Sequence, residues 1–173
     1  MRTVVLDPST ASLEELLEHR RRSGLDRLDE VWEGALHMVP APDDAHADIA
    51  QQLALALNGP ARAAGLFPTM HEFNLGSSME DFRVPDGGLH RARRWGTWEH
   101  TAPLVVEIVS PSDETWQKLP FYAAHAVDEV LIVDPRKRVV HWLGLRDGEY
   151  EPIERSAVID LGPDELAKRI DWP

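Results

Sequence analysis

The chain has 173 residues, 43 % of them hydrophobic, which fits a single domain with a core of its own. Its 30 acidic and 18 basic residues give a formal net charge of −12, which argues against a broad, sequence-independent grip on nucleic acid, because such binding needs many Lys and Arg side chains on phosphates. The sequence has no cysteine and no long apolar run, which excludes disulfides, thiolate zinc sites, a cysteine nucleophile and a membrane-spanning helix. We therefore expect one cytoplasmic domain over residues 1–173, without a membrane partner.

The N-terminal part of the sequence predicts a helix followed by a hairpin. Leucines at helical spacing favour a helix over residues 12–22. Residues 27–39 alternate in polarity and predict two short strands, joined by a turn at Glu33-Gly34. Glu33 is thus expected at the tip of this hairpin.

A second helix is expected to begin at Asp43 or Asp44, either of which can cap it. Apolar residues then recur at helical spacing, until Asn58-Gly59-Pro60 predicts an interruption. Residues 61–64 can extend this helix by a turn. Residues 66–73 are typical of a strand.

The middle of the chain predicts one strand between two loops. Residues 75–81 contain Gly and Ser and predict a polar loop. Residues 82–89 predict a strand that bends at Pro85, and residues 90–101 predict a surface loop. This loop holds the basic and aromatic residues Arg91, Arg93, Arg94, Trp95 and Trp98. It can contact a phosphate backbone and stack on a base, or it is simply a mobile surface loop.

Residues 104–109 give the strongest strand prediction, because they are apolar on both faces, as in a central strand that is covered from both sides. A helix is expected to follow from Ser110, with a break at Pro120. Residues 129–133 predict the next strand, and together these elements form a strand–helix–strand crossover.

The C-terminal part predicts a hairpin and a closing helix. Residues 139–145 and 149–153 flank Asp147-Gly148, a strong signal for a hairpin turn, and residues 163–170 favour a helix. The crossover makes its two strands parallel, whereas the hairpin is antiparallel. The expected fold is therefore α/β (α+β), with a mixed central β-sheet that is flanked by helices and ends in a C-terminal β-hairpin.

Glu107 is the unusual residue of the predicted central strand. A carboxylate in such a strand is costly to bury without a partner. Two interpretations follow from the strand alone. Either Glu107 pairs with an arginine or lies at an exposed strand end, or it binds a cation.

Asp86 strengthens the interpretation that Glu107 binds a cation. It lies in Val84-Pro85-Asp86-Gly87, where an aspartate can also be an ordinary turn residue. Together, however, Asp86 and Glu107 offer two hard oxygen ligands about twenty residues apart. Such a pair suits Mg²⁺ or Mn²⁺, which take carboxylates and keep several waters.

Three further side chains complete the candidate set. Lys118 lies about two helical turns after Ser110, so its amine can reach back to orient a water or stabilise phosphate charge, unless it is simply exposed to solvent. Glu33 can supply another acid or can be a surface carboxylate. His46 lies on the inward side of its helix and is interpreted as a hydrogen-bonded histidine near the edge of the core. No histidine pair has the spacing of a zinc site.

Several short motifs follow one another in order over residues 10–155. They are Trp32–Pro42 (WEGALHMVPAP), His46, Pro85-Asp86, Leu104–Ser112 (LVVEIVSPS), Lys118, Tyr122, Val127-Asp128-Glu129 and Val133-Asp134-Pro135. The ordered set resembles the Uma2 family, a large bacterial group of restriction-endonuclease-like proteins within the PD-(D/E)xK nuclease superfamily.

The resemblance implies a restriction-endonuclease-like core and a set of site residues. Asp86 and Glu107 correspond to the metal-binding acids, with the backbone carbonyl of Ile108 as a further ligand. Lys118 corresponds to the catalytic lysine, moved onto the helix after the second acid. Glu33 matches the N-terminal acid of the family.

The function implied by the resemblance is hydrolysis of DNA phosphodiester bonds that depends on Mg²⁺ (or Mn²⁺). The metal would polarise a phosphoryl oxygen and lower the pKa of a bound water. A homodimer is expected, since cutting both strands commonly uses paired sites. The acidic charge and Pro120 favour an alternative, a non-catalytic binding or assembly protein with a nuclease-like fold. Hydrolysis of a small phosphorylated molecule is a third hypothesis, which a closed pocket would favour.

Overall fold

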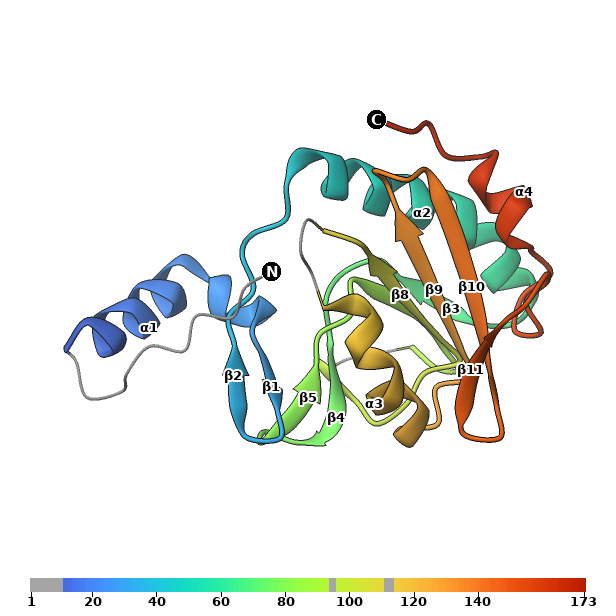
Figure 1. Cartoon of the computed structure of the whole chain (residues 1–173). Coiled ribbons are helices and arrows are strands. Elements are labelled where there is room, and N and C mark those ends of the chain that lie inside the picture. Colours follow the sequence, from blue (N-terminus) through green and yellow to red (C-terminus); the bar gives the residue numbers. More distant parts are fainter. Residues whose placement is uncertain (1–10, 94–95, 111–113) are drawn as a thin grey trace.

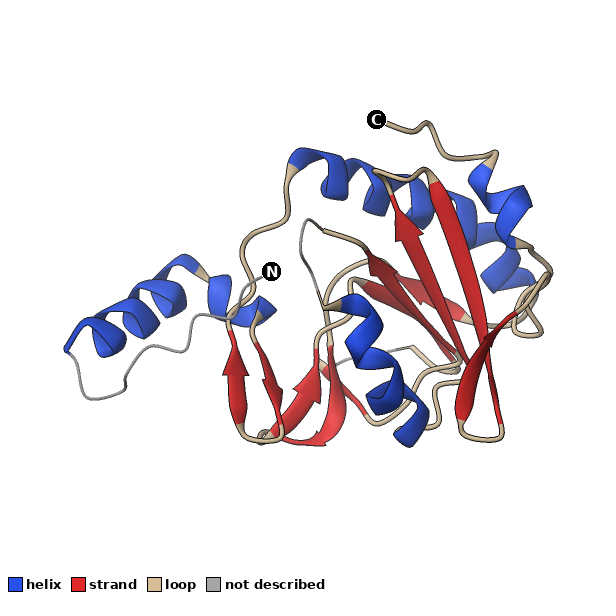
Figure 2. Cartoon of the chain, in the orientation of Figure 1, coloured by secondary structure: helices blue, strands red, loops and turns tan. Residues whose placement is uncertain are grey.

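The computed structural model describes residues 11–93, 96–110 and 114–173, and it describes side chains from residue 14 onward. Within these residues, two β-sheets are flanked by helices (Figures 1 and 2). The helical elements are α1 (Ala11–Ser23), η1 (Leu25–Leu28), α2 (Asp44–Ala63), η2 (Thr115–Lys118), α3 (Leu119–Ala124) and α4 (Pro163–Ala167). Elements η1 and η2 are 3-10 helices.

The strands of the described residues divide into a larger and a smaller sheet, which are both mixed. The six-stranded sheet has the order β11 (Glu149–Pro152), β10 (Val139–Arg146), β9 (Glu129–Asp134), β8 (Leu104–Ile108), β6 (Gly87–His90) and β3 (Phe67–Thr69). The five-stranded sheet has the order β2 (Ala35–His37), β1 (Glu30–Trp32), β5 (Asp81–Arg83), β4 (Asn74–Ser78) and β7 (Trp98–Glu99). The prediction of a mixed sheet with flanking helices is confirmed, and the smaller sheet is an addition to it.

Strand β8 lies inside the larger sheet, as its sequence predicts. It runs parallel to β9 and antiparallel to β6, so the crossover over residues 104–133 is confirmed. Because side chains alternate along a strand, Leu104, Val106 and Ile108 face the core that α2 and α4 cover. Val105 faces the other side, where α3 packs. Glu107 shares that second side, which directs its carboxylate toward α3.

Helix α2 runs through the predicted interruption. It begins after Asp43, whose carboxylate accepts the backbone N–H of His46 at 2.9 Å. The buried residues Leu57 and Ala61 flank Pro60 and pack into the core of the larger sheet. This burial outweighs the hydrogen bond that Pro60 removes, so the predicted break at this point is wrong.

The prediction of a loop over residues 75–81 is also wrong, because the chain forms strand β4 and the turn into β5. Leu75 is fully buried, and Gly76 approaches β5 so closely that a Cβ atom there would lie 2.7 Å from the backbone oxygen of Asp81. The predicted single strand over residues 82–89 is two strands, β5 and β6, which belong to different sheets. Pro85 lies between them, where the chain passes from one sheet to the other.

Both predicted hairpin turns are confirmed. Glu33-Gly34 joins β1 to β2 with φ angles of 50° and 87°, and Asp147-Gly148 joins β10 to β11 with φ angles of 49° and 88°. Two successive residues with positive φ are the geometry of a type I′ turn, which suits an Asp-Gly pair. The hairpin at the C-terminal edge of the larger sheet therefore follows directly from the local sequence.

The remaining elements agree with the sequence in type and differ in length. Helix α1 covers the predicted residues 12–22 and extends away from the two sheets (Figure 1). The predicted loop over residues 90–101 contains the short strand β7. The start of the helix expected after Ser110 falls on residues 111–113, outside the described residues, and the break predicted at Pro120 corresponds to the step from η2 to α3.

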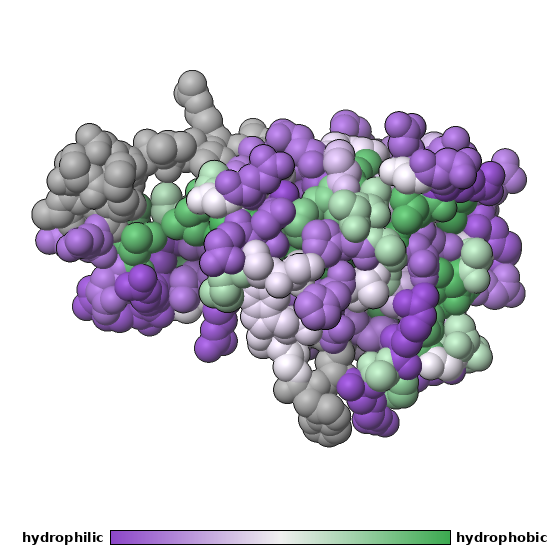
Figure 3. Space-filling model, turned by 90° about the horizontal axis from the view of Figure 1, so that it is seen from below, coloured by the Kyte–Doolittle hydropathy of each residue, from purple (hydrophilic) through white to green (hydrophobic). Residues whose placement is uncertain are grey.

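The surface is mixed in character, consistent with the charge of the chain. On the face seen from below, hydrophobic residues lie scattered among hydrophilic ones (Figure 3). None of the helices in the described parts of the chain has the length and apolar character needed to cross a bilayer.

Candidate active site

A cleft of about 360 Å³ opens where the two sheets meet. Its walls come from the segment between η1 and α2, the start of α2, the segments just before β4 and β6, the end of β8, and η2. Six carboxylate side chains line it, and Lys118 is the single Lys or Arg among its described lining residues. The acidic lining residues are Glu30, Asp43, Glu72, Asp86, Glu107 and Glu114. The cleft therefore concentrates negative charge around one ammonium group.

Glu107 and Lys118 form the centre of this cluster. Strand β8 presents Glu107 on the side of α3, and Lys118 ends η2 just before α3 begins. Lys118 Nζ lies 3.1 Å from each carboxylate oxygen of Glu107, and the Tyr122 hydroxyl donates to Glu107 Oε1. Pro120 does not turn the lysine away, because it occupies the first turn of α3, where a missing N–H is tolerated.

Asp86 lies beside Glu107 because of the register between β6 and β8. Gly87 pairs with Val106, so the residue before Gly87 reaches the end of β8. Asp86 Oδ2 accepts the backbone N–H of Ile108 at 2.7 Å, and Asp86 Oδ1 lies 3.0 Å from His46 Nε2. Both carboxylate oxygens are thus held, one by the sheet and the other by α2.

Glu30 is the third acid of the cluster, and like Glu107 it is buried. Its side chain is 3 % exposed, and Oε1 lies 2.8 Å from Lys118 Nζ. Oε1 also accepts the backbone N–H of Val84 at 2.8 Å, and Oε2 accepts Trp32 Nε1–H at 2.7 Å. Lys118 therefore lies between two carboxylates, Glu30 on β1 and Glu107 on β8.

Burial and crowding of like charges shift the proton affinities of these groups. Burial raises the pKa of Glu107 to about 8, Lys118 opposes the rise, and the Asp86 and Glu30 carboxylates add to it. Burial works to lower the pKa of Lys118, but Glu107 and Glu30 raise it above its ordinary range, so the ammonium stays charged. The site as a whole has more negative charge than its own cation neutralises.

The same forces act on the two neighbours that hydrogen-bond to these acids. Burial and the charges of Glu107 and Glu30 raise the pKa of the Tyr122 hydroxyl well above its ordinary value, so it remains a donor. Burial works to lower the pKa of His46, but the hydrogen bond and charge of Asp86 raise it overall. His46 Nδ1 also lies 3.3 Å from the hydroxyl oxygen of Ser110. His46 is thus a hydrogen-bonded histidine, as its sequence position suggests.

Of the candidates from the sequence, Asp86, Glu107 and Lys118 come together, and the backbone of Ile108 lies with them. Glu33 does not join them. It is exposed at the β1–β2 turn, where its backbone N–H donates to Asp81 Oδ1 at 3.2 Å. The acid that β1 contributes to the cleft is Glu30, three residues earlier.

Sequence reasoning missed Glu30 and gave Tyr122 no role beyond its place in the motif, although each left a local signal. Tyr122 follows Lys118 by four residues, so both can face the same neighbour from consecutive helical turns. Glu30 and Trp32 are two residues apart on one strand and share a face, which makes Glu30 a partner for the indole N–H. Neither signal is specific without the knowledge of what packs against these faces.

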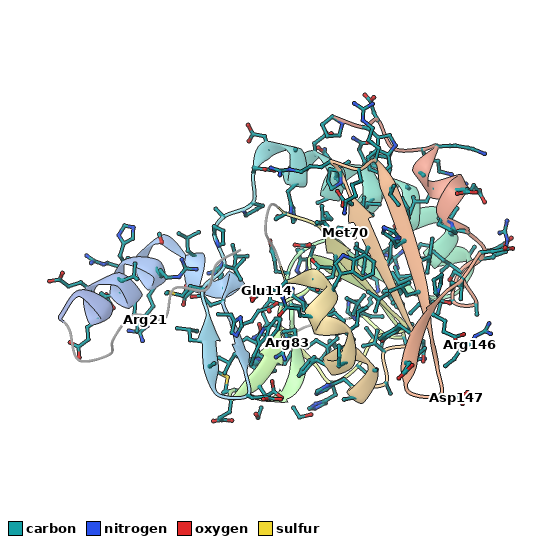
Figure 4. The ribbon with its side chains drawn as sticks, in the orientation of Figure 1. Arg21, Met70, Arg83, Glu114, Arg146 and Asp147 are labelled. Atoms are coloured by element: carbon teal, nitrogen blue, oxygen red, sulfur yellow. The ribbon has the colours of Figure 1, made fainter. Side chains whose placement is uncertain are left out.

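Arg83 lies beneath this cluster and ties its two sides together. The guanidinium group of Arg83, which is labelled in Figure 4, stacks on Trp32 of β1, at 4.2 Å from the ring centre, and on Phe121 of α3, at 4.0 Å. It also donates to the backbone oxygen of Val31 at 3.0 Å. Arg83 therefore contacts both β1, which carries Glu30, and α3, which begins directly after Lys118.

None of the described residues in the basic loop after β6 lines the cleft. Asp86 precedes β6, whereas Arg91 follows it, so the two lie at opposite ends of this strand. Arg91 pairs with Asp128 at 2.6 Å, and the guanidinium of Arg93 lies 5.5 Å from the Phe67 ring. Of the other members of the predicted basic cluster, residues 94–95 fall outside the described residues.

The two mixed sheets with flanking helices define the protein as an α/β (α+β) fold. The chain belongs to the Uma2 family, whose family model, described as "Putative restriction endonuclease", matches residues 13–167. It is similar in fold to a solved structure titled as a "putative nuclease belonging to DUF820" from Anabaena variabilis, with 15 % sequence identity and a TM-score of 0.63. The match covers 82 % of this chain and 90 % of that one. No curated protein matches the chain.

Proposed function

We propose that the protein is a nuclease that hydrolyses DNA phosphodiester bonds with the help of Mg²⁺ or Mn²⁺ and acts in the cytoplasm. The observation that carries the proposal is the convergence of Asp86, Glu107 and Lys118 in one cleft of a Uma2 family member. Two carboxylates can hold a divalent cation that assists phosphodiester hydrolysis, and a nearby ammonium can stabilise the charge that develops on the phosphate.

The donor set of the cleft fits a hard divalent cation. The described residues contain no group of three or more His, Asp or Glu side chains spaced to enclose a metal ion. Mg²⁺, however, is commonly held by only one or two carboxylates, with waters and substrate phosphates as the other ligands. Asp86 and Glu107 would supply these carboxylates, with the Ile108 carbonyl as a further ligand. Burial is the main cause of the raised pKa of Glu107, and the negative charges of Asp86 and Glu30 add to it; a cation would offset the part that these charges contribute.

The bound cation would polarise the phosphate and provide a water of lowered pKa. The chain's own groups have separate tasks. Asp86 is held in place by Ile108 and His46, so its carboxylate is fixed before substrate arrives. The Lys118 ammonium faces the cleft and would stabilise the negative charge that develops on the phosphate oxygens. Cutting both strands of a duplex would use two such sites, as in a homodimer.

A second candidate is a binding or assembly protein with the same fold and no catalysis. The observation in its favour is that Lys118 already pairs with Glu30 and Glu107, so the cluster contains its own cation. In this case the acids would have a structural role, and neither metal nor DNA would act at the cleft.

Cleavage assays with matched variants test the nuclease proposal. Supercoiled plasmid and single-stranded DNA are incubated with the protein in Mg²⁺, in Mn²⁺ and in EDTA. We expect metal-dependent cleavage by the parent protein and a loss of at least a hundredfold in Glu107→Gln and Lys118→Met. Glu151→Gln makes the same chemical change on the exposed strand β11 and should cleave like the parent. Equal cleavage by all four proteins, or by none, would contradict the proposal.

A further inference from the structure

We propose that Glu30 is a positioning residue that holds Lys118 when a divalent cation occupies the Glu107 carboxylate. This inference rests on the proposed function, and it assigns a role to an acid that the sequence did not indicate. Its basis is the position of Lys118 Nζ, which lies 2.8 Å from Glu30 Oε1 and 3.1 Å from both oxygens of Glu107.

Glu30 is held as a fixed acceptor. Its carboxylate receives the Val84 N–H on one oxygen and the Trp32 indole N–H on the other. One donor lies on β1 and the other directly follows β5, and together they fix both the position and the plane of the carboxylate. The remaining interaction of Oε1 is with Lys118, so Glu30 offers the lysine a site that does not depend on Glu107.

Lys118 and a cation would compete for Glu107. The ammonium contacts both carboxylate oxygens of Glu107, which are the atoms that a metal ligand must offer. The two positive charges would also repel each other at this short distance. Metal binding therefore requires Lys118 to give up part of its contact with Glu107.

Glu30 lowers the free energy that this exchange requires. An ammonium that is only 12 % exposed is strongly destabilised if it loses its partner. With Glu30 in place, Lys118 keeps one charged contact and moves little, so its amine stays at the wall of the cleft. Without the Glu30 charge, Lys118 has Glu107 as its remaining close carboxylate and should bind it more tightly. The metal should then bind Glu107 more weakly.

Mn²⁺ affinity, measured by calorimetry at fixed pH, tests this role through a double-mutant cycle. We expect Glu30→Gln to weaken Mn²⁺ binding about tenfold when Lys118 is present and less than twofold in the Lys118→Met background. Lys118→Met alone should strengthen binding, because it removes the competitor. Glu114→Gln is the matched control. It removes a carboxylate that lines the same cleft but pairs with His37 at 3.0 Å, so its small effect should be equal in both backgrounds (Figure 4).

The outcomes separate this inference from the proposed function. An equal loss from Glu30→Gln in both Lys118 backgrounds would mean that Glu30 acts only through its charge, and it would overturn the positioning role while leaving the metal site intact. Absence of Mn²⁺ binding in the parent and in Lys118→Met would overturn both proposals. If Glu30→Gln does not fold, as judged by circular dichroism, Trp32→Phe removes one of the two donors to Glu30. It should weaken binding in the same direction, again only when Lys118 is present.

Discussion

Replacing Glu107 with glutamine should remove most of the pH dependence of folding stability between pH 5 and pH 8. The pKa of Glu107 is raised from an ordinary 4.5 to about 8 in the folded chain, chiefly by burial. Between these pH values the folded protein holds a proton that the unfolded chain has released. The contribution of this proton to stability is complete below about pH 4.5 and is lost as the pH rises through about 8.

The size of the effect follows from the same pKa values. At about 1.4 kcal/mol for each tenfold change in proton affinity, the rise from 4.5 to about 8 gives an upper limit of about 5 kcal/mol. Most of it is lost between pH 5 and pH 8, so the free energy of unfolding of the parent should fall by about 3 kcal/mol over this range. Glutamine does not titrate, so the variant should lack this component.

Urea unfolding followed by tryptophan fluorescence measures this difference. Both proteins are unfolded in EDTA at several pH values from 5 to 8, and their free energies of unfolding are subtracted at each pH. The raised pKa of His46 also makes stability fall with pH, but this group is present in both proteins and largely cancels in the difference. A difference that stays constant across the range would refute the assignment of a raised pKa to Glu107.

Three further predictions concern the fold and the basic loop. Leu53→Ala, in the fully buried face of α2, should lower the free energy of unfolding by about 2–5 kcal/mol in the same urea assay. Gly76→Ala should destabilise the β4–β5 hairpin by about 1–3 kcal/mol, because the new Cβ would meet the backbone oxygen of Asp81, and a lowered melting temperature would report it. Arg91→Ala should leave plasmid cleavage within twofold of the parent, because Arg91 lies in an exposed ion pair at the far end of β6 from Asp86. A large loss of cleavage would instead assign the basic loop to DNA binding.

Local patterns made several parts of the fold predictable. The turns at Glu33-Gly34 and Asp147-Gly148 need residues that accept positive φ, and in each turn these are two adjacent residues, of which the second is glycine. The apolar run at residues 104–109 likewise marks a strand that is buried on both faces. In each case, the element can be predicted from the residues that form it, without knowledge of what they contact elsewhere in the chain.

Pairing between distant segments was not predictable in the same way. Residues 75–81 appear loop-like in sequence, and they form a strand because Leu75 is buried and Gly76 allows β5 to approach. The single strand expected over residues 82–89 divides at Pro85 because its two halves find partners in different sheets. Helix α2 likewise continues past Pro60 because of a contact with distant residues: Ala61 is buried in the core of the larger sheet.

The site likewise has one part that the sequence predicts and one part that depends on contacts between distant segments. The spacing of Asp86, Glu107 and Lys118 suggested a cluster, and the register of β6 on β8 brings the two acids together. The difference between Glu30 and Glu33 depends on contacts with Val84 and Lys118, which lie 54 and 88 residues after Glu30 in the sequence. One sequence without these contacts gives no reason to prefer the buried acid to the exposed one.

A crystal structure with bound Mn²⁺ would test the metal site most directly. Anomalous diffraction from crystals grown with Mn²⁺ locates the ion without relying on activity. We predict a peak in the cleft within about 2–2.5 Å of a carboxylate oxygen of both Asp86 and Glu107, and no peak there in Glu107→Gln. A cleft without a peak at saturating Mn²⁺, or a peak only at other surface acids, would contradict the metal-dependent nuclease proposal.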